Sequence, residues 1–310
     1  MLKRKLFGVE QMFARRNNKR NVGFTLVEML VTIGIIAVVI GMLVPALSMV
    51  RDTANRVKQK AQFSTLEVGL EAFKNDFGDY PPDVLVGGDV SGTYEYTSYT
   101  GAQRLAEAII GQDGFGVNTG SSFNGDMSFY GMYTDPVTDE QRPIGTRQGP
   151  YVEIENANAT RLSAIYPDTA LTSTSLNPAT FVLSDEYGLV KSRISGEQTG
   201  MPVLYYKANT SKFGHSELGT TDYLYYNTDK NVYNPICNRV IYGLGSAPSV
   251  QGANMLNGPG TFWDYFLKKI ENPNFSTNSR PYRAQSFILH SAGADGRYGT
   301  SDDIYNFDKK

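Results

Sequence analysis

Three carboxylates lie close together near the C-terminus, in the stretch "SAGADGRYGTSDDI" at 291–304: Asp295, Asp302 and Asp303. Three glycines are interspersed with them, and glycine lets a loop turn its backbone carbonyl oxygens inward. Carboxylate and carbonyl oxygens suit Ca²⁺ better than zinc. The spacing differs from that of an EF-hand, which needs acids at alternate positions and a distal Glu. The residues alone leave two interpretations open, a calcium-binding loop and a solvated acidic turn.

Residue types that carry catalysis are scarce elsewhere. The chain has two histidines, His215 and His290, and a single cysteine, Cys237. One cysteine can form neither an intrachain disulfide nor a cysteine zinc cluster. No phosphate-binding loop, dinucleotide fingerprint or HExxH motif occurs. Scattered Asp and Glu residues leave a glycosidase-type pair open, but we expect no enzyme.

A further acid, Glu28, begins a long apolar segment, "GFTLVEMLVTIGIIAVVIGMLVPAL" at 23–47. No charged residue lies between Glu28 and Arg51, which gives about 33 Å of helix, enough to cross a bilayer core of about 30 Å. Residues 1–22 carry seven bases and one acid, so we expect the N-terminus to stay in the cytoplasm. Four bases between 51 and 60 oppose this orientation. A buried core helix is seldom this long without charge, and a secretory signal has a shorter apolar region with a cleavage site after it.

The stretch "GFTLVEMLV" at 23–31 resembles the prepilin signature of type IV pilins and type II secretion pseudopilins. The resemblance implies that prepilin peptidase cuts between Gly23 and Phe24, and that Phe24 is then N-methylated. It also implies that Glu28 meets the N-terminal amine of a neighbouring subunit during filament assembly, and that Pro45 lies where these helices commonly kink. A carboxylate in lipid costs energy, so a contact that neutralises it favours assembly. A surface acid without a partner is the alternative.

Beyond Arg51 the pattern becomes amphipathic. Apolar residues recur at three- and four-residue steps with one five-residue slip: Ala54, Val57, Ala61, Leu66, Leu70, Phe73 and Phe77. Gly78 and the prolines that follow are typical of a helix end. The sequence therefore predicts a leader at 1–23, a transmembrane assembly helix at 24–50, and an amphipathic helix at 51–80 that packs on a sheet.

Residues 81–310 are predicted to form a periplasmic globular head. The stretch at 102–112 predicts a short helix. Further patterns predict strands at 201–209, 222–228 and 239–245, and a helix at 261–270. The segment 114–270 has no counterpart in an ordinary major pseudopilin, so we expect insertions there. The predicted fold class is α+β and pilin-like, with a long N-terminal helix packed on an antiparallel β-sheet, large insertions and a C-terminal acidic loop.

Two other stretches resemble the major pseudopilin of type II secretion systems. "FKNDFGDYP" at 73–81 is similar to the end of its long helix, and 291–304 resembles its calcium loop. This resemblance implies Ca²⁺ as a cofactor, with these ligands: Asp295 and Asp303 first, then Asp302, Ser291 and the carbonyl groups of Ala292 and Thr300.

These observations together predict a structural subunit rather than an enzyme. We expect a single-pass inner-membrane protein whose head is periplasmic and which polymerises into the periplasmic pseudopilus of a type II secretion system. Expected partners are copies of itself, other pseudopilins, prepilin peptidase, the inner-membrane assembly platform and the lipid bilayer. The net charge is -2, and acids and bases are mixed, so we expect no nucleic-acid partner. The alternatives are a type IV pilin or minor pilin with an adhesive or ligand-binding inserted head, and a periplasmic enzyme on a pilin-like anchor.

Overall fold

The computed structural model describes residues 23–83, 99–214, 231–244, 266–275 and 279–308. Contacts between Cα atoms divide the chain into two compact units, Met1–Val50 and Arg51–Lys310. Most of the leader predicted at 1–23, the strand predicted at 222–228 and the first half of the helix predicted at 261–270 lie outside the described residues.

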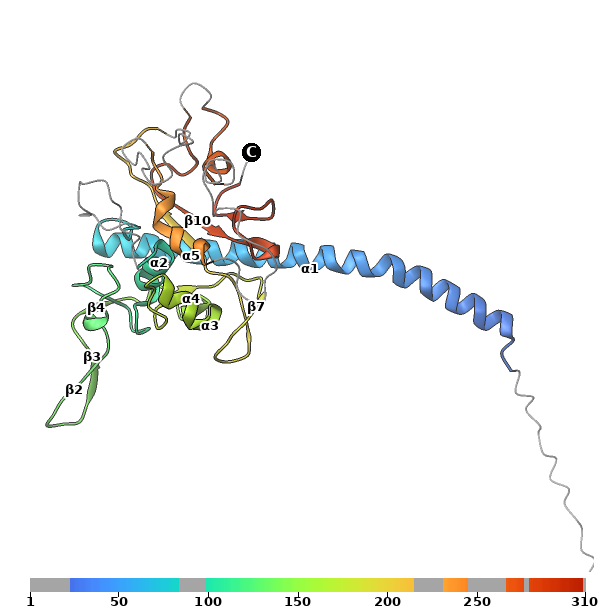
Figure 1. The fold of residues 1–310 in the computed structure, drawn as a ribbon, viewed down its shortest axis with the longest axis horizontal. Coiled ribbons are helices and arrows are strands. Elements are labelled where there is room, and N and C mark those ends of the chain that lie inside the picture. The colour runs from blue at the N-terminus through green and yellow to red at the C-terminus, as the bar shows by residue number, and fades with distance from the viewer. Residues whose placement is uncertain (1–22, 84–98, 215–230, 245–265, 276–278, 309–310) are drawn as a thin grey trace, which may run out of the picture. The chain divides into compact units, whose positions relative to one another are not determined.

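The longest element is helix α1, Leu26–Phe77, drawn from blue to cyan in Figure 1. It continues through Pro45, although proline has no N–H to donate to the preceding turn. The kink predicted at Pro45 stays a prediction. By its length and composition the helix can cross a membrane, and no part of its most apolar window is buried. The first unit thus presents an uncovered apolar surface.

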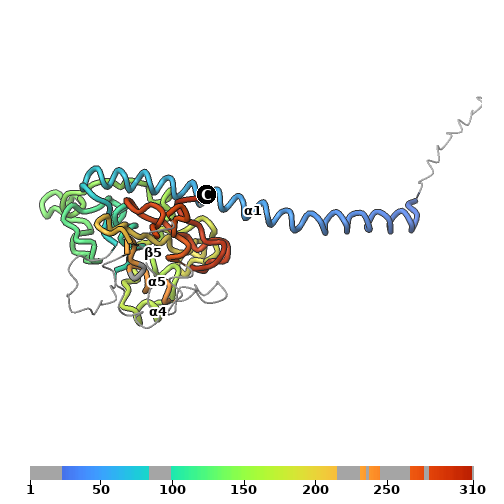
Figure 2. The backbone as a smooth tube through the Cα atoms, turned by 90° about the horizontal axis from the view of Figure 1, so that it is seen from above, coloured from blue at the N-terminus to red at the C-terminus, as the bar shows by residue number. Residues whose placement is uncertain are grey.

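In the second unit, α1 packs on a three-stranded antiparallel sheet with the order β11-β10-β9. The strands are β9 (Leu204–Lys207), β10 (Phe287–Ser291) and β11 (Ile304–Tyr305). Phe63, Leu66 and Leu70 of α1 share one buried cluster with Tyr205 and Phe287 of the sheet. Figure 2 shows the second half of α1 running along one side of this unit. The predicted pilin-like α+β arrangement is confirmed.

The predicted inward face of α1 is right only for its later residues. The buried residues are Gln59, Gln62, Phe63, Leu66, Gly69, Leu70 and Phe73. Ala54, Val57 and Ala61, which were predicted to face inward, are exposed, and Val57 keeps 63% of its surface. The reason is the five-residue slip between Ala61 and Leu66, because with 3.6 residues per turn such a step moves the stripe to another face.

Two glutamines take the place of apolar side chains on this buried face. Gln59 Nε2 donates to Gln62 Oε1 over 2.8 Å, and Gln62 Nε2 donates to the carbonyl oxygen of Ser184 over 2.7 Å. The backbone N–H of Glu186 donates to Gln59 Oε1 over 2.8 Å. Because each buried polar group has a partner, the glutamines tie α1 to the segment that follows strand β6 (Phe181–Leu183).

The other elements surround this core. Helix α2 (Gly101–Ile110) is entirely buried and confirms the helix predicted at 102–112. Four two-stranded antiparallel pairs follow: β1 (Val117–Asn118) with β4 (Arg147–Gln148), β2 (Met132–Thr134) with β3 (Gln141–Pro143), β5 (Ala159–Arg161) with β6 (Phe181–Leu183), and β7 (Val190–Lys191) with β8 (Gln198–Thr199). The short helices are α3 (Leu162–Ile165), α4 (Asp168–Ser173), α5 (Arg239–Gly243) and α6 (Lys268–Ile270).

One predicted strand is wrong. Residues 239–245 contain the run Val-Ile-Tyr, but Arg239–Gly243 form helix α5 after the 3₁₀ turn Pro235–Asn238. Val240, Ile241 and Tyr242 are all buried in the largest core cluster. A continuous apolar run shows neither the two-residue period of a half-buried strand nor the 3.6-residue period of an amphipathic helix. The sequence therefore does not distinguish strand from helix there. The strand predicted at 201–209 is confirmed over its central part by β9.

The assignment of the two faces of α1 predicts different effects for two substitutions. Leu70→Ala, at a fully buried position, should lower the free energy of unfolding by about 2 to 4 kcal/mol because it leaves a cavity. Val57→Ala should change it by less than about 0.5 kcal/mol, since the side chain is exposed. Urea unfolding of the detergent-solubilised chain measures both, and equal losses would contradict the assignment.

Candidate functional site

The acidic loop 291–304 joins β10 to β11 and is described throughout. A close approach of the chain to itself explains one of its glycines. Gly293 has a φ of 69°, and a β-carbon there would lie 2.3 Å from the carbonyl oxygen of Asp302. A side chain at 293 would therefore push the two ends of the loop apart.

On one side of the loop, Asp302 contacts the turn that contains Asp295. Asp302 Oδ2 accepts a hydrogen bond from the backbone N–H of Asp295 over 2.8 Å, and Asp302 Oδ1 accepts one from Thr300 Oγ1 over 2.5 Å. Partial burial, with a smaller contribution from the charge of Asp302, raises the pKa of Asp295. When two carboxylates lie near each other, a cation bound between them offsets their mutual repulsion.

Asp303 points to the opposite side, into the core. Its side chain is 2% exposed, and its Oδ2 lies 2.9 Å from Nε2 of the fully buried His290. The same oxygen accepts from the N–H of Gly299 over 2.9 Å, while Oδ1 has no hydrogen-bond partner. The ring of His290 stacks on Tyr305, with centroids 4.5 Å apart. Asp303 thus contacts the strand at which the loop begins.

The other predicted ligands are partly occupied by protein groups. Ser291 Oγ donates to Asp185 Oδ2 over 3.0 Å, and the carbonyl oxygen of Thr300 accepts from Lys269 Nζ over 3.0 Å. Ala292 is buried. Across the described residues, the whole loop included, no three His, Cys, Asp or Glu side chains form a metal-binding group. The loop therefore fits Ca²⁺ through Asp295, Asp302 and backbone oxygens better than through all three acids.

Sequence reasoning missed Asp185 and Lys269 as neighbours of the loop. Each lies more than 20 residues from it along the chain, in a segment without a recognisable motif. Only the fold brings them there.

At the other candidate site, Glu28 lies in the first turn of α1. Its Oε2 accepts from the backbone N–H and the Oγ1 of Thr25, both over 2.8 Å, and the N–H of Glu28 donates to Thr25 Oγ1 over 3.3 Å. This is a capping box, which satisfies donors at the start of a helix. Thr25 is neutral, so these hydrogen bonds supply no opposite charge to the Glu28 carboxylate. None of the ion pairs among the described residues includes Glu28.

The predicted cleavage site lies directly before the helix. Gly23 and Phe24 have no regular secondary structure, and Phe24 keeps 72% of its surface exposed. A β-carbon on Gly23 would meet nothing within 4 Å. The bond between these residues is therefore accessible to a peptidase. The capping box of Thr25 and Glu28 begins one residue after Phe24.

Comparison with known proteins gives one match. Residues 18–44 match the family model described as the prokaryotic N-terminal methylation motif. The match supports the pilin family. It indicates a type IV pilin-like or pseudopilin subunit, and together with the apolar α1 it is consistent with membrane anchoring. No curated protein and no solved structure matches the chain.

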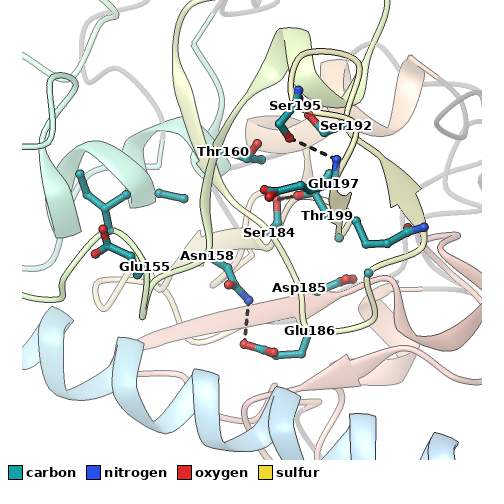
Figure 3. Close-up of a pocket in the computed structure, with 15 residues that line it drawn as sticks. Glu155, Asn158, Thr160, Ser184, Asp185, Glu186, Ser192, Ser195, Glu197 and Thr199 are labelled. Carbon is teal, nitrogen blue, oxygen red and sulfur yellow. Dashed lines mark hydrogen bonds between the residues drawn. The ribbon is translucent and has the colours of Figure 1, made fainter.

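The pilin-like chain also has a polar hollow of about 490 Å³, which is lined by residues of β5 and β8 and of the segments that follow β6 and β7 (Figure 3). Its lining includes Glu155, Asp185, Glu186 and Glu197 together with several hydroxyl and amide groups, and none of the lining residues is Lys or Arg. Asn158 Nδ2 donates to Glu186 Oε1 over 2.7 Å. A lining of this kind suits a cationic or hydroxyl-rich group.

Asp185 lies between this hollow and the acidic loop. Its Oδ1 accepts from the backbone N–H of Met201 over 3.2 Å and from that of Tyr187 over 3.3 Å, and Ser291 donates to its Oδ2. Burial raises the pKa of Asp185 to about 7, although these hydrogen bonds oppose the shift. A buried carboxylate with this pKa takes up a proton near neutrality.

Asp185 should therefore contribute a pH-dependent cost to stability. Its folded pKa lies above the unfolded value of about 3.9, so the folded chain binds the extra proton and its stability falls as the pH rises from about 4 to about 7. Above the folded pKa the cost is constant. Asp185→Asn removes this contribution, so its unfolding free energy minus that of the parent should rise between pH 5 and 7.5. Parallel pH profiles in calorimetry or urea unfolding would contradict the shift.

Proposed function

We propose that the chain is a pseudopilin, a structural subunit that polymerises through α1 into the periplasmic pseudopilus of a type II secretion system. The observation that carries this proposal is the position of the methylation motif at the start of an apolar helix whose surface is exposed. A soluble monomer would hide such a surface. Lipid covers it before assembly, and neighbouring helices cover it in the filament.

Glu28 supplies the specific contact. Cleavage after Gly23 makes Glu28 the fifth residue, about 6 Å along the helix from the new amine of Phe24. Thr25 holds the carboxylate at the end of the helix through hydrogen bonds, where it can receive the amine of a neighbouring subunit. Removing two opposite charges from poor solvation favours association.

The assignment to type II secretion, rather than to pili in general, rests on the C-terminal loop. We propose that Ca²⁺ binds there through Asp295 and Asp302 with backbone oxygens. Its role is structural, because a cation that binds only the folded chain stabilises it by mass action. Asp303 and His290 then hold β11 on β10 from the other side of the loop.

The remaining assignments follow from the same proposal. The N-terminus lies in the cytoplasm and the head in the periplasm, with a single crossing of the inner membrane. The partners are further copies, other pseudopilins, prepilin peptidase and the assembly platform. The proposal requires neither catalysis nor nucleic-acid binding.

A second function has one observation in its favour. The polar hollow of Figure 3 lies within the enlarged middle of the chain. A ligand bound there would make the chain a type IV pilin or minor pilin with a binding head. Saturable binding of a small amine or saccharide, abolished by Glu197→Gln, would favour this alternative.

Mass spectrometry of the protein extracted from membranes tests the first step. In cells with active prepilin peptidase, we expect the chain to begin at an N-methylated Phe24. Gly23→Val should leave the full-length chain, because the peptidase requires a small residue before the cut, whereas Gly41→Ala should be processed as the parent. An intact Met1 start in the parent would contradict processing.

A matched pair of substitutions tests the loop. Asp302→Asn should remove most of the increase in Tm that Ca²⁺ gives and leave the Tm in EDTA almost unchanged. Asp303→Asn should lower stability by about 2 kcal/mol with or without Ca²⁺, because it alters a buried contact with His290. Thermal unfolding in both conditions measures this. If Asp302→Asn lowers the Tm equally in both, the loop is an acidic turn without metal.

A further inference from the structure

Helix α1 has a second apolar stripe that its own unit leaves open. Between Arg51 and Val68 the stripe consists of Ala54, Val57, Ala61, Thr65 and Val68, all exposed. Val57 keeps 63% of its surface and Val68 keeps 71%. These positions recur at three- and four-residue steps and lie roughly opposite the buried face. Beside the stripe lies a hollow of about 670 Å³, whose other wall includes Val152 and Tyr151.

Two exposed bases lie beside this stripe. Arg51 and Lys58 are seven residues apart, so they lie on the same side of the helix, next to the stripe. Between 51 and 60 the only acid is Asp52, and Lys60 is engaged with Asp308. The carboxylates on the opposite wall of the hollow, Glu153 and Glu186, accept hydrogen bonds from asparagine side chains of their own unit. Neutral amides supply no positive charge, and the helix side of the hollow carries one, on Lys58.

The hairpin β2–β3 has complementary features. Its tip carries Asp135, Asp139 and Glu140 and no base, and Val137 at the tip is 90% exposed. Asp135 Oδ1 accepts from the N–H of Val137 over 2.8 Å, so the turn that projects Val137 is ordered locally. In the stem, Arg142 lies over the ring of Tyr133, 5.2 Å from its centroid. An ordered tip loses little entropy when it binds.

The hairpin and the stripe lie at different places on the same unit. The pair β1–β4, which flanks the hairpin along the chain, is anchored at the end of α1, where Val117 packs with Phe73 and Tyr151 donates to Asp76 over 2.7 Å. Figure 1 shows the hairpin projecting away from the rest of the unit. Because its tip points away from the rest of its own unit, the hairpin leaves the stripe of its own chain uncovered.

We propose that the hairpin β2–β3 of one copy docks on the exposed α1 stripe of a second copy. Val137 packs against Val57 and Ala61, and Asp139 and Glu140 face Arg51 and Lys58. A contact between two different patches of the same chain is heterologous, so it repeats from copy to copy and extends a filament. The inference rests on the proposed function, to which it adds a contact between heads.

Cysteine cross-linking in assembled filaments of the full chain tests the contact. The native Cys237 is buried, so introduced cysteines react selectively. Val137→Cys with Val57→Cys should give a ladder of covalent oligomers with a short bismaleimide, because the two side chains meet in the proposed contact. The control pairs Val57→Cys with Ile194→Cys, which is 66% exposed on the β7–β8 turn, and should give none. Equal ladders from both pairs, or filaments without any ladder, would overturn the docking.

A charge exchange tests the orientation. Lys58→Glu should reduce the yield of filaments about tenfold, because like charges then meet at the contact. Glu140→Lys in the same chain should restore it, and Lys191→Glu, a control on exposed β7, should have no effect. No rescue by the double variant would overturn the pairing. The parent chain distinguishes failure of the two proposals. If the parent is processed but never polymerises, the proposed function is wrong. If filaments form but the cysteine pair gives no ladder, only the docking contact is wrong.

Discussion

The whole arrangement depends on the contact between the second half of α1 and the sheet β11-β10-β9. Phe63, Leu66 and Leu70 share one buried cluster with Tyr205 and Phe287, and burial of such side chains contributes about 1.5–3 kcal/mol each. Only the second half of the helix makes this contact. In the first half, no part of the most apolar window is buried. The same element is thus a core helix over one part of its length and an uncovered apolar helix over the other.

The sequence predicts much of this helix because its signals are local. The uncharged span, the motif at residues 23–31 and the spacing of Leu66, Leu70 and Phe73 are all read from neighbours along the chain. The five-residue slip after Ala61 is a sequence signal for a change of face. A single continuous stripe through Ala54, Val57 and Ala61 does not predict the buried Gln59 and Gln62. Glutamine enters a core only when tertiary partners exist, and these partners lie near residue 185.

The acidic loop shows a second limit of prediction from the sequence. Asp302 and Asp303 are adjacent, yet their side chains make contacts on opposite sides of the loop. Three acids in nine residues therefore do not form one cluster: Asp302 lies by Asp295, and Asp303 lies in the core with His290. The glycines and the acids could be predicted from sequence. Lys269 and Asp185 could not, because only tertiary packing brings them to the loop.

The two apolar stripes of α1 would give the proposed filament a second constraint besides the membrane segment. A contact between Glu28 and an amine is electrostatic and acts at one point, so it sets the axial position of a helix but not its rotation. Val57, Ala61 and Val68 lie on one side only, so a head that binds them also fixes rotation about the helix axis. A filament with a defined twist requires both constraints. The slip in the apolar pattern therefore gives one helix a buried face for its own sheet and an exposed face, which the proposed contact would cover with a neighbouring copy.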